Sequence, residues 1–296
     1  MTSKSSSWAS VASQSTFVLL WGSAAIFTRW GLDHGSVFAL LIFRYALALS
    51  ALFLIGLPSR RWLPKPGTRW SVAGTGLLMI GSYSFCYFQA MGHGITPGLM
   101  ATVLGVQPIL TLLLTERRFS FWRLLGLLLA LTGLTLVVYQ SLVRASLSGV
   151  GMVFALGALI STTFGALLQK RVQQAPSEVL PLQYVVALAL YVLLMPSQPF
   201  HFEWNWGFLA PLLFLGLVIS VAAQLLLYRL IRSGNLVNVT SLFYLVPVVT
   251  VVLDYVILGH VMPPLAMVGM FAILAGLLLA QGADARRRGV PQEAVG

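Results

Sequence analysis

Charged residues are scarce in this sequence. Asp, Glu, Lys and Arg together make up 8% of its 296 residues, and only seven residues are acidic. Soluble globular domains carry about a quarter charged residues, because their surfaces face water. Hydrophobic residues instead make up 58% of the chain. This composition excludes an ordinary soluble domain and indicates an integral membrane protein.

Cysteine and histidine are scarce too. Cys86 is the single cysteine, which excludes an intramolecular disulfide and a metal site built from cysteines. The histidines have no acidic residue at the spacing of a metal site; they are His34, His93, His201 and His260. We therefore predict that the protein needs no metal and no other cofactor. A nucleophile-elbow motif and a glycine-rich phosphate loop are also lacking, so an intramembrane enzyme is an alternative without support from any motif.

Long apolar stretches account for nearly the whole chain. We predict ten of them, at residues 13–31, 36–57, 70–91, 96–115, 120–140, 149–170, 178–195, 206–228, 236–258 and 264–282. Each can cross ~30 Å of hydrocarbon as a helix that rises about 1.5 Å per residue. The stretch LLGLLLALTGLTLVVY (124–139) is continuously apolar, whereas strands of a membrane barrel alternate polar and apolar residues. The predicted fold class is all-α, with ten transmembrane helices.

Basic residues give the chain a formal net charge of +11. Fifteen of the eighteen fall on one side of a ten-helix topology: Lys4, Arg60, Arg61, Lys65, Arg69, Arg117, Arg118, Arg123, Lys170, Arg171, Arg229, Arg232, Arg286, Arg287 and Arg288. The positive-inside rule then places both termini in the cytoplasm of a cell with a bacterial-type inner membrane. The opposite side would hold His34, His93, Glu203 and His260. This pattern favours the lipid bilayer over nucleic acid as a partner.

Matching residues recur at a nearly constant offset along the chain. Pro108 and Pro247 are 139 residues apart. The other matched pairs are Thr111 with Thr250, at the same offset, and Gly126 with Gly269 and Gly133 with Gly276, at an offset of 143. Two halves of five helices, residues 1–145 and 146–296, would cross the membrane in opposite directions because five is odd, which predicts an inverted repeat. The alternative is chance similarity between leucine-rich helices. We expect the paired glycines to serve close helix packing rather than gating.

At these residues the sequence resembles the drug/metabolite transporter superfamily, in its ten-helix EamA branch. The resemblance rests on LLWGSAAIFTRWGL and FALLIFRYALALSALFLI near the start, on the two proline-containing helices, and on the two helices with paired glycines. It implies a secondary transporter built around a central cavity. A leucine-glycine-glutamate sequence that is frequent in the family reads LLTER at Glu116 and ILGH at His260. Within the branch the sequence is most similar to the YddG-type exporters of aromatic amino acids, which implies export.

Polar and aromatic side chains at helical spacing are the candidates for such a cavity. Ser220, Gln224 and Tyr228 follow one face of the span 206–228, and Trp21 and Thr28 share a face of the first span. The candidate substrate-binding residues are Trp21, Tyr83, Tyr87, Gln107, Ser161, Gln224, Tyr228, Asn238, Ser241 and Tyr244. The hydroxyl groups could instead bond to their own helix, and the aromatic rings could serve packing. Gly105, Pro108 and Pro247 are candidates for helix bending or gating, because proline removes a backbone hydrogen bond.

Arg44 and Asp254 are the clearest charges inside predicted spans. Each would cost ~3 kcal/mol at the centre of a membrane unless it is paired or hydrated. We expect Arg44 to anchor its helix to helix-end carbonyl groups, with Asp254 as a candidate partner. The small number of buried charges favours a neutral or zwitterionic solute, such as an aromatic amino acid, moved by alternating access without ATP. The alternative is a proton-coupled exporter of organic cations that uses Asp254; a monomer is compatible with either function.

Overall fold

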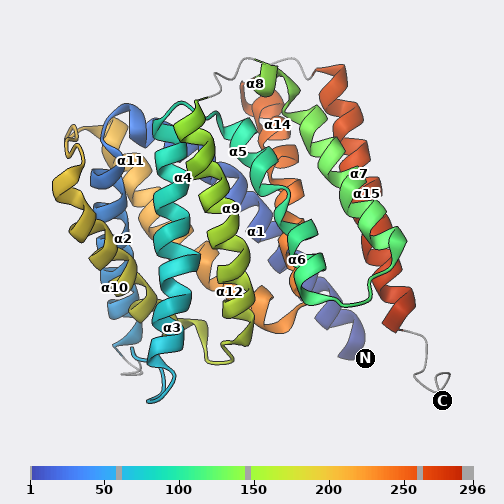
Figure 1. Ribbon diagram of the computed structural model, residues 1–296, viewed down its shortest axis with the longest axis horizontal. Helices are drawn as coiled ribbons and strands as arrows, with labels where there is room; N and C mark the ends of the chain where they lie inside the picture. Colours follow the sequence, from blue (N-terminus) through green and yellow to red (C-terminus); the bar gives the residue numbers. More distant parts are fainter. Residues whose placement is uncertain (1, 58–61, 144–147, 259–262, 289–296) are drawn as a thin grey trace.

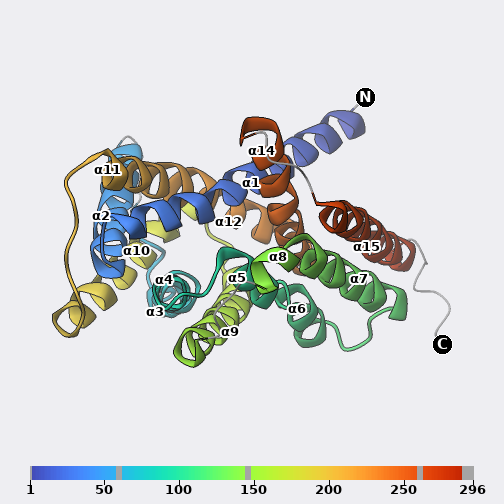
Figure 2. The ribbon, with the colours of Figure 1, turned by 90° about the horizontal axis from the view of Figure 1, so that it is seen from above.

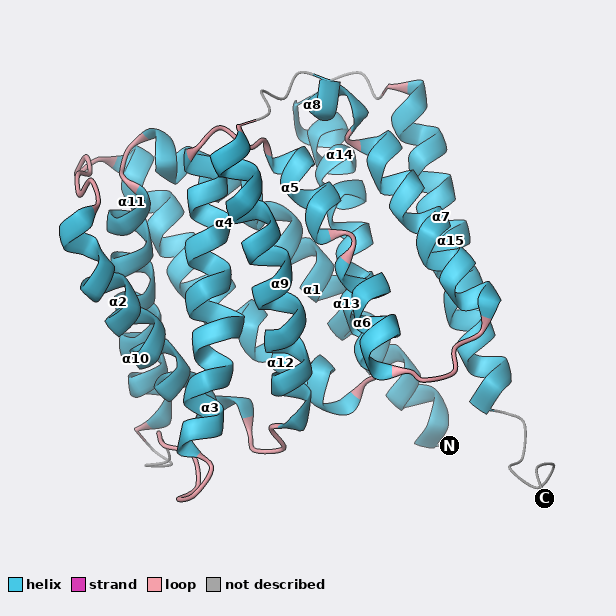
Figure 3. Ribbon diagram, viewed as in Figure 1, coloured by secondary structure: helices cyan, strands magenta, loops and turns pink. Residues whose placement is uncertain are grey.

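The computed structural model describes residues 2–57, 62–143, 148–258 and 263–288. Within these residues the regular elements are all helices, and the single isolated β-bridge joins Gly35 to Phe202 (Figure 3). In this described part of the chain, six helices are long and apolar enough to cross a membrane: Val37–Gly56, Pro97–Thr115, Gly149–Arg171, Pro176–Leu194, Trp206–Ser233 and Pro264–Asp284. Phe121–Val137 and Leu236–Val249 are shorter apolar helices. The prediction of an all-helical membrane protein is confirmed.

The first part of the chain forms helices that run alternately up and down (Figure 1). They are α1 (Thr2–Asp33), α2 (Val37–Gly56), α3 (Arg69–Gly76), the π-helical η1 (Leu77–Ser82), α4 (Tyr83–Gly92), α5 (Pro97–Leu104), α6 (Gln107–Thr115), α7 (Phe121–Val137) and α8 (Tyr139–Val143). Side chains define two of the starts. Ser36 accepts from the amide of Ala39 at the start of α2, and Thr96 accepts from the amide of Leu99 at the start of α5.

The second part of the chain repeats the alternation (Figure 1). Its elements are α9 (Gly149–Arg171), α10 (Pro176–Leu194), the 3₁₀-helical η2 (Met195–Ser197), α11 (Trp206–Leu213), the π-helical η3 (Phe214–Ala223), α12 (Gln224–Ser233), α13 (Leu236–Ser241), the 3₁₀-helical η4 (Leu242–Tyr244), α14 (Leu245–Leu258) and α15 (Pro264–Arg288). Every predicted apolar stretch coincides with one helix or with several consecutive helical segments. The ends differ most at α1, which begins well before residue 13.

The basic loops lie at one end of the helices. The connections from α2 to α3, α6 to α7, α9 to α10 and α12 to α13 are at the bottom of Figure 1, where α1 begins and α15 ends. The connections that contain His34, His93 and Glu203 lie at the top. The prediction also used Arg60, Arg61 and His260, which lie outside the described residues.

Two glycine pairs bring α7 and α15 into backbone contact. A Cβ atom added at Gly126 would lie 2.6 Å from the carbonyl oxygen of Gly276, and one added at Gly133 would lie 2.6 Å from that of Gly269. Only glycine permits this approach, as predicted for close helix packing in membranes. Figure 2 shows the two helices side by side at one edge of the molecule. Their outer faces carry exposed apolar side chains such as Phe271 and Leu278, which suits contact with lipid.

Candidate functional site

A cavity of about 120 Å³ lies between the two parts of the chain. From the first part, α1, α2, η1, α4, α5 and α6 contribute to its wall; from the second, α9, η3, α12, α13, η4 and α14 do so. Figure 2 shows α1, α4, α5, α9 and α12 arranged around the middle of the bundle. The cavity wall is mostly apolar, with amide, hydroxyl and guanidinium groups at a few places.

Five of the predicted substrate-binding residues line this cavity: Trp21, Tyr83, Tyr87, Gln107 and Gln224. The centroids of the Tyr83 and Tyr87 rings are 5.8 Å apart, and Trp21 meets Phe243 edge to face with centroids 5.6 Å apart. Such flat aromatic faces can stack on a planar solute. Thr28 also lines the cavity, as its shared face with Trp21 predicts.

Buried amide groups give the wall its neutral polar character. Gln107 and Gln224 are 4% and 9% exposed, which places both side chains in the interior rather than in lipid. The amide nitrogen of Gln107 donates to the carbonyl oxygen of Thr162 over 3.4 Å. Its carbonyl oxygen is an acceptor that a ligand group can use, because an amide side chain both donates and accepts hydrogen bonds.

Ser161 is not among the residues that line the cavity. Its neighbour Thr162 is, together with Ala166 one turn later. The glycines one turn before and one turn after Ser161 are used for packing. A Cβ atom added at Gly157 would lie 3.0 Å from the Cys86 sulfur, and one at Gly165 would lie 2.7 Å from the Met79 Cα. Small side chains at a helix contact let two backbones approach each other, so this face of α9 turns toward η1 and α4.

Tyr228 also lies outside the cavity wall, although Gln224 lines it. The helix that carries both contains η3, in which the hydrogen-bond pattern is π-helical from Phe214 to Ala223. A π-helical turn adds a residue and rotates the following face relative to a regular helix. That segment ends before Gln224, so it shifts Ser220 relative to the later residues and leaves Gln224 and Tyr228 in the regular helix α12. The cavity face of α12 follows Gln224, Leu227 and Ile231, and Tyr228 beside it is 1% exposed in the core.

The remaining candidate substrate-binding residues, Asn238, Ser241 and Tyr244 on the span 236–258, also lie outside the cavity wall. The Ser241 hydroxyl donates to the carbonyl oxygen of Val237 over 2.6 Å, which is the alternative of bonding to its own helix. Asn238 belongs to a polar cluster near the end of the bundle that holds the basic loops. Tyr244 is fully buried, and its hydroxyl donates to the carbonyl oxygen of Gly105 over 2.6 Å. Thr240 and Phe243, which sequence reasoning missed, line the cavity in their place.

The helices that carry Pro108 and Pro247 are each interrupted just before the proline. α5 ends at Leu104 and α6 begins at Gln107, so Gly105 lies in the break that precedes Pro108. In the second part, η4 separates α13 from α14 shortly before Pro247. Gly105 and Pro247 line the cavity, whereas Pro108 is buried outside its wall. The two breaks therefore lie next to the cavity.

Arg44 lines the cavity and is 8% exposed. Its Nε donates to the hydroxyl oxygen of Ser220 over 2.7 Å. This contact joins α2 to the π-helical segment η3, and it corrects the prediction that Arg44 binds helix-end carbonyl groups. Asp254, its predicted partner, is on α14, but the side chain of Asp254 lies outside the described part of the structure.

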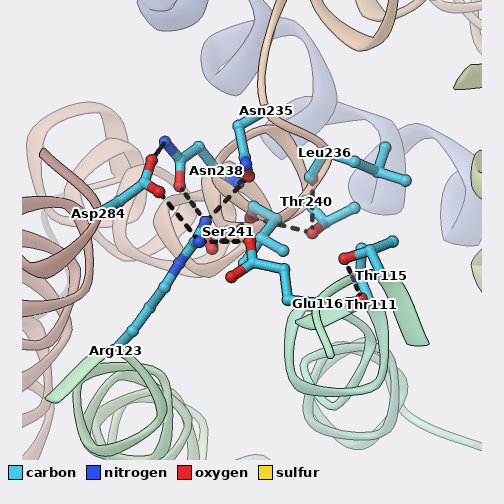
Figure 4. Close-up of polar contacts among 11 residues, drawn as sticks. Thr111, Thr115, Glu116, Arg123, Asn235, Leu236, Asn238, Thr240, Ser241 and Asp284 are labelled. Atoms are coloured by element: carbon cyan, nitrogen blue, oxygen red, sulfur yellow. Dashed lines mark hydrogen bonds and ion pairs between the residues drawn. The ribbon is translucent and has the colours of Figure 1, made fainter. Parts of the chain in front are cut away.

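Arg123 is the centre of a second buried cluster (Figure 4). One terminal nitrogen binds the carboxylates of Glu116 at 2.5 Å and Asp284 at 3.1 Å. The other donates to the side-chain oxygens of Asn235 at 2.9 Å and Asn238 at 3.0 Å. Charge-assisted bonds of this kind are about twice as strong as neutral ones. The cluster joins α6 and α7 to α13 and α15.

The sequence prediction treated Arg123 as one of many loop cations, and Asn238 as a substrate contact. The structure instead places Arg123 in the first turn of α7 with 2% of its surface exposed. Asn238 is oriented by the cluster, because its amide nitrogen donates to Asp284 over 3.2 Å. The carboxylates of Glu116 and Asp284 are the acidic signals that could have indicated buried partners for a basic residue.

At the opposite end, a histidine and a glutamate join the α1–α2 loop to the loop before α11. His34 Nδ1 lies 3.0 Å from a carboxylate oxygen of Glu203. Hydrogen bonds from His34 and Asn205 hold the pKa of the exposed Glu203 carboxyl below its usual value. Ser36 adds a backbone bond, since its amide donates to the carbonyl oxygen of His201 over 2.8 Å. This end therefore carries an exposed contact between the two parts.

Comparison with known proteins identifies the family to which the chain belongs. The EamA-like transporter family matches residues 11–139 and again residues 149–281. The chain belongs to this family. It is accordingly a multi-pass membrane transporter of the drug/metabolite transporter superfamily and not an enzyme. Its membership agrees with the apolar helices and the central cavity described above.

Two proteins and one solved structure are similar to this EamA-family chain. It is 26% identical over 284 residues to a protein named probable amino-acid metabolite efflux pump from Salmonella typhimurium, with 88% of this chain and 91% of the relative covered. It is 25% identical over 205 residues to the uncharacterized transporter YvbV from Bacillus subtilis, covering 66% and 64%. A solved crystal structure with 20% identity shares the fold, with a TM-score of 0.75 over 91% of this chain and 97% of the other.

Proposed function

We propose that this EamA-family transporter exports amino acids with aromatic side chains, as the YddG-type exporters do. The observation that carries the proposal is the cavity wall, in which the rings of Trp21, Tyr83 and Tyr87 accompany the amides of Gln107 and Gln224. Rings can stack on the solute's side chain, and amides can bond to its amino and carboxyl groups. The name of the Salmonella relative, an amino-acid metabolite efflux pump, supports the same class of solute.

We further propose ten transmembrane helices in two inverted halves, residues 1–145 and 146–296. The two matches to the family begin and end at corresponding places. The glycines on α7 and α15 also support the repeat, since Gly126 matches Gly269 and Gly133 matches Gly276 in sequence. In space the pairs cross, because Gly126 contacts Gly276 and Gly133 contacts Gly269. A two-fold axis between two copies of one helix produces this exchange of partners.

The orientation in the membrane follows from the loops. The basic connections lie at the same end as the start of α1 and the end of α15. The positive-inside rule makes this end cytoplasmic in a bacterial-type inner membrane. The partners of the chain are then lipid and a small-molecule substrate, and a monomer contains a complete cavity.

Alternating access through this cavity is the mechanism that we propose. Transport requires the wall to open first toward one side of the membrane and then toward the other. The breaks at Gly105 and at η4 adjoin the cavity, so the two halves of each interrupted helix can change their relative angle. The Arg123 cluster joins both halves of the chain at the proposed cytoplasmic end. Opening toward the cytoplasm therefore requires this cluster to rearrange.

Exchange in proteoliposomes tests the proposed substrate. Liposomes with the purified protein should exchange labelled tryptophan or phenylalanine without ATP, and Gln224→Ala or Tyr87→Ala should slow the exchange without reducing protein yield. The matched control is Tyr139→Ala, because Tyr139 is exposed and lies away from the cavity wall. If neither amino acid is exchanged while an organic cation moves with a pH gradient in an Asp254-dependent manner, the proton-coupled alternative is correct.

A further inference from the structure

Arg44 presents an unusual combination of burial and incomplete pairing. Its Nε is occupied by the hydroxyl of Ser220. In the described part of the chain, the terminal nitrogens of its guanidinium group have no hydrogen-bond acceptor, and no carboxylate lies within ion-pair distance. A guanidinium carries five N–H donors. Most of the donor capacity of Arg44 is therefore directed at the cavity that it lines.

The surroundings hold the guanidinium in place. Its central carbon lies 5.1 Å from the centroid of the Tyr45 ring and 5.7 Å from that of Phe88, so both rings can stabilise the cation. The Tyr45 hydroxyl is fixed by a 2.6 Å hydrogen bond with the Ser84 hydroxyl. The Ser220 hydroxyl in turn donates to the carbonyl oxygen of Leu215 over 2.9 Å. Arg44 thus has a fixed position with its charge toward the cavity.

Arg123 is a buried arginine whose partners are supplied by the chain itself, and it serves as a comparison for Arg44. Arg123 has two carboxylates and two amide oxygens around its terminal nitrogens. Arg44 has one hydroxyl and two aromatic rings. An unpaired charge inside a membrane protein is costly and marks a substrate or ion pathway. The difference indicates that the counter-charge of Arg44 arrives with the transported solute.

We propose that Arg44 binds the carboxylate of the transported solute and so selects carboxylate-bearing solutes over their amides, esters and amines. This inference rests on the proposed function, because it takes the central cavity as the transport site. Arginine suits this role, since its planar fork can bind both oxygens of a carboxylate. The aromatic wall at Tyr83, Tyr87 and Trp21 then receives the other end of the solute. Organic cations without a carboxylate are excluded as the main cargo.

Competition for exchange tests the assignment. Proteoliposomes are loaded with unlabelled L-phenylalanine, and the uptake of labelled L-phenylalanine is measured against external L-phenylalanine or L-phenylalaninamide. Wild type should prefer the acid over the amide by about tenfold or more, because hydrogen bonds to charged groups contribute about 1.5–3 kcal/mol. Arg44→Gln should weaken competition by the acid and make the two competitors equal. Arg44→Lys should keep part of the preference for the acid.

Arg29→Gln is the matched control, since Arg29 is an exposed arginine that pairs with Asp33 outside the cavity wall. It should behave like wild type. Thermal unfolding of each variant separates loss of binding from loss of fold. If Arg44→Gln unfolds, the comparison is made between Arg44→Lys and wild type. An unchanged preference for the acid in a folded Arg44 variant overturns the assignment, as does a wild type that does not distinguish acid from amide.

Failure of the proposed aromatic specificity would give a different result. Wild type would then exchange no aromatic amino acid. In that case, leucine, threonine and alanine are each compared with their amides, by exchange and by thermal stabilisation of the protein in detergent. A preference for any acid that Arg44→Gln removes supports the role of Arg44 although the aromatic proposal is wrong. If no pair shows a preference in either assay, the assignment of Arg44 is overturned.

Discussion

The Tyr244 hydroxyl donates to the Gly105 carbonyl oxygen over 2.6 Å, and the two residues are 139 positions apart, the same interval that separates Pro108 from Pro247. Gly105 lacks the usual helical donor, because the amide of Ile109 bonds to Val106 instead. A carbonyl freed beside a proline inside a membrane needs another partner. The corresponding break in the second part, η4, supplies it. The break in the first interrupted helix is thus completed by the second.

Tyr244→Phe removes this donor and leaves the Gly105 carbonyl oxygen buried. The free energy of unfolding should fall by about 1–3 kcal/mol, the usual cost of an unsatisfied buried polar group. Thermal unfolding of the purified protein measures the change. Tyr139→Phe is the control, because Tyr139 is 49% exposed. Equal melting temperatures for Tyr244→Phe and wild type would show that the hydrogen bond contributes nothing.

Gly276→Ala should push α7 and α15 apart, because its Cβ atom would lie 2.5 Å from the Gly126 carbonyl oxygen. Overpacking of this kind costs roughly 1–3 kcal/mol. Gly282→Ala on the same helix has open space within 4 Å of the added carbon, so it should be neutral or slightly stabilising, since alanine favours helix more than glycine does. Thermal unfolding of the two variants decides the point. Similar losses in both would contradict a specific role for the contact.

Arg123→Ala leaves Glu116 and Asp284 without their shared cation. Removing one partner of a buried ion pair costs about 3–5 kcal/mol, so the yield of folded protein and its melting temperature should both fall. Arg118→Ala, at an exposed position in the loop before α7, should leave both unchanged. A stable Arg123→Ala variant would show that water replaces the guanidinium at this end.

Cysteine accessibility tests the topology in a Cys86→Ala background. Trp204→Cys, at an exposed position in the loop before α11, should react with an impermeant maleimide in intact cells. Lys65→Cys, in the exposed loop before α3, should react only after permeabilisation. The positive-inside rule gives this direction. Labelling of Lys65→Cys in intact cells would invert the topology.

Much of the fold could be predicted from local signals. Continuous apolar stretches predict membrane helices because lipid offers no hydrogen bonds to the backbone. Gly126, Gly133 and their matches predicted a close helix contact, and the structure has it. Pro108 and Pro247 predicted bends, and the structure interrupts both helices just before them. These signals depend on residues close in sequence, which is why they could be interpreted without coordinates.

The polar contacts were harder to predict because they join distant residues. Asn238 and Gln224 both occupy apolar helices, yet one binds Arg123 and the other lines the cavity. Composition alone does not distinguish them. The π-helical segment η3 also shifts Ser220 relative to the residues that follow it, and no residue type marks such a segment. Arg44 was expected to bind helix-end carbonyl groups, because no sequence signal links it to its actual partner Ser220, which is 176 positions away.

The contact between α7 and α15 also has a consequence for biosynthesis. The ribosome makes α7 early, whereas α15 is made after every other helix that the structure describes. Helices α9 to α14 are made in the interval. During that time the face of α7 that carries Gly126 and Gly133 has no contact with α15. A chain released before α15 is made would leave this face of α7 exposed to lipid or to other proteins. The packing of the first half is thus completed only after α15 has been made.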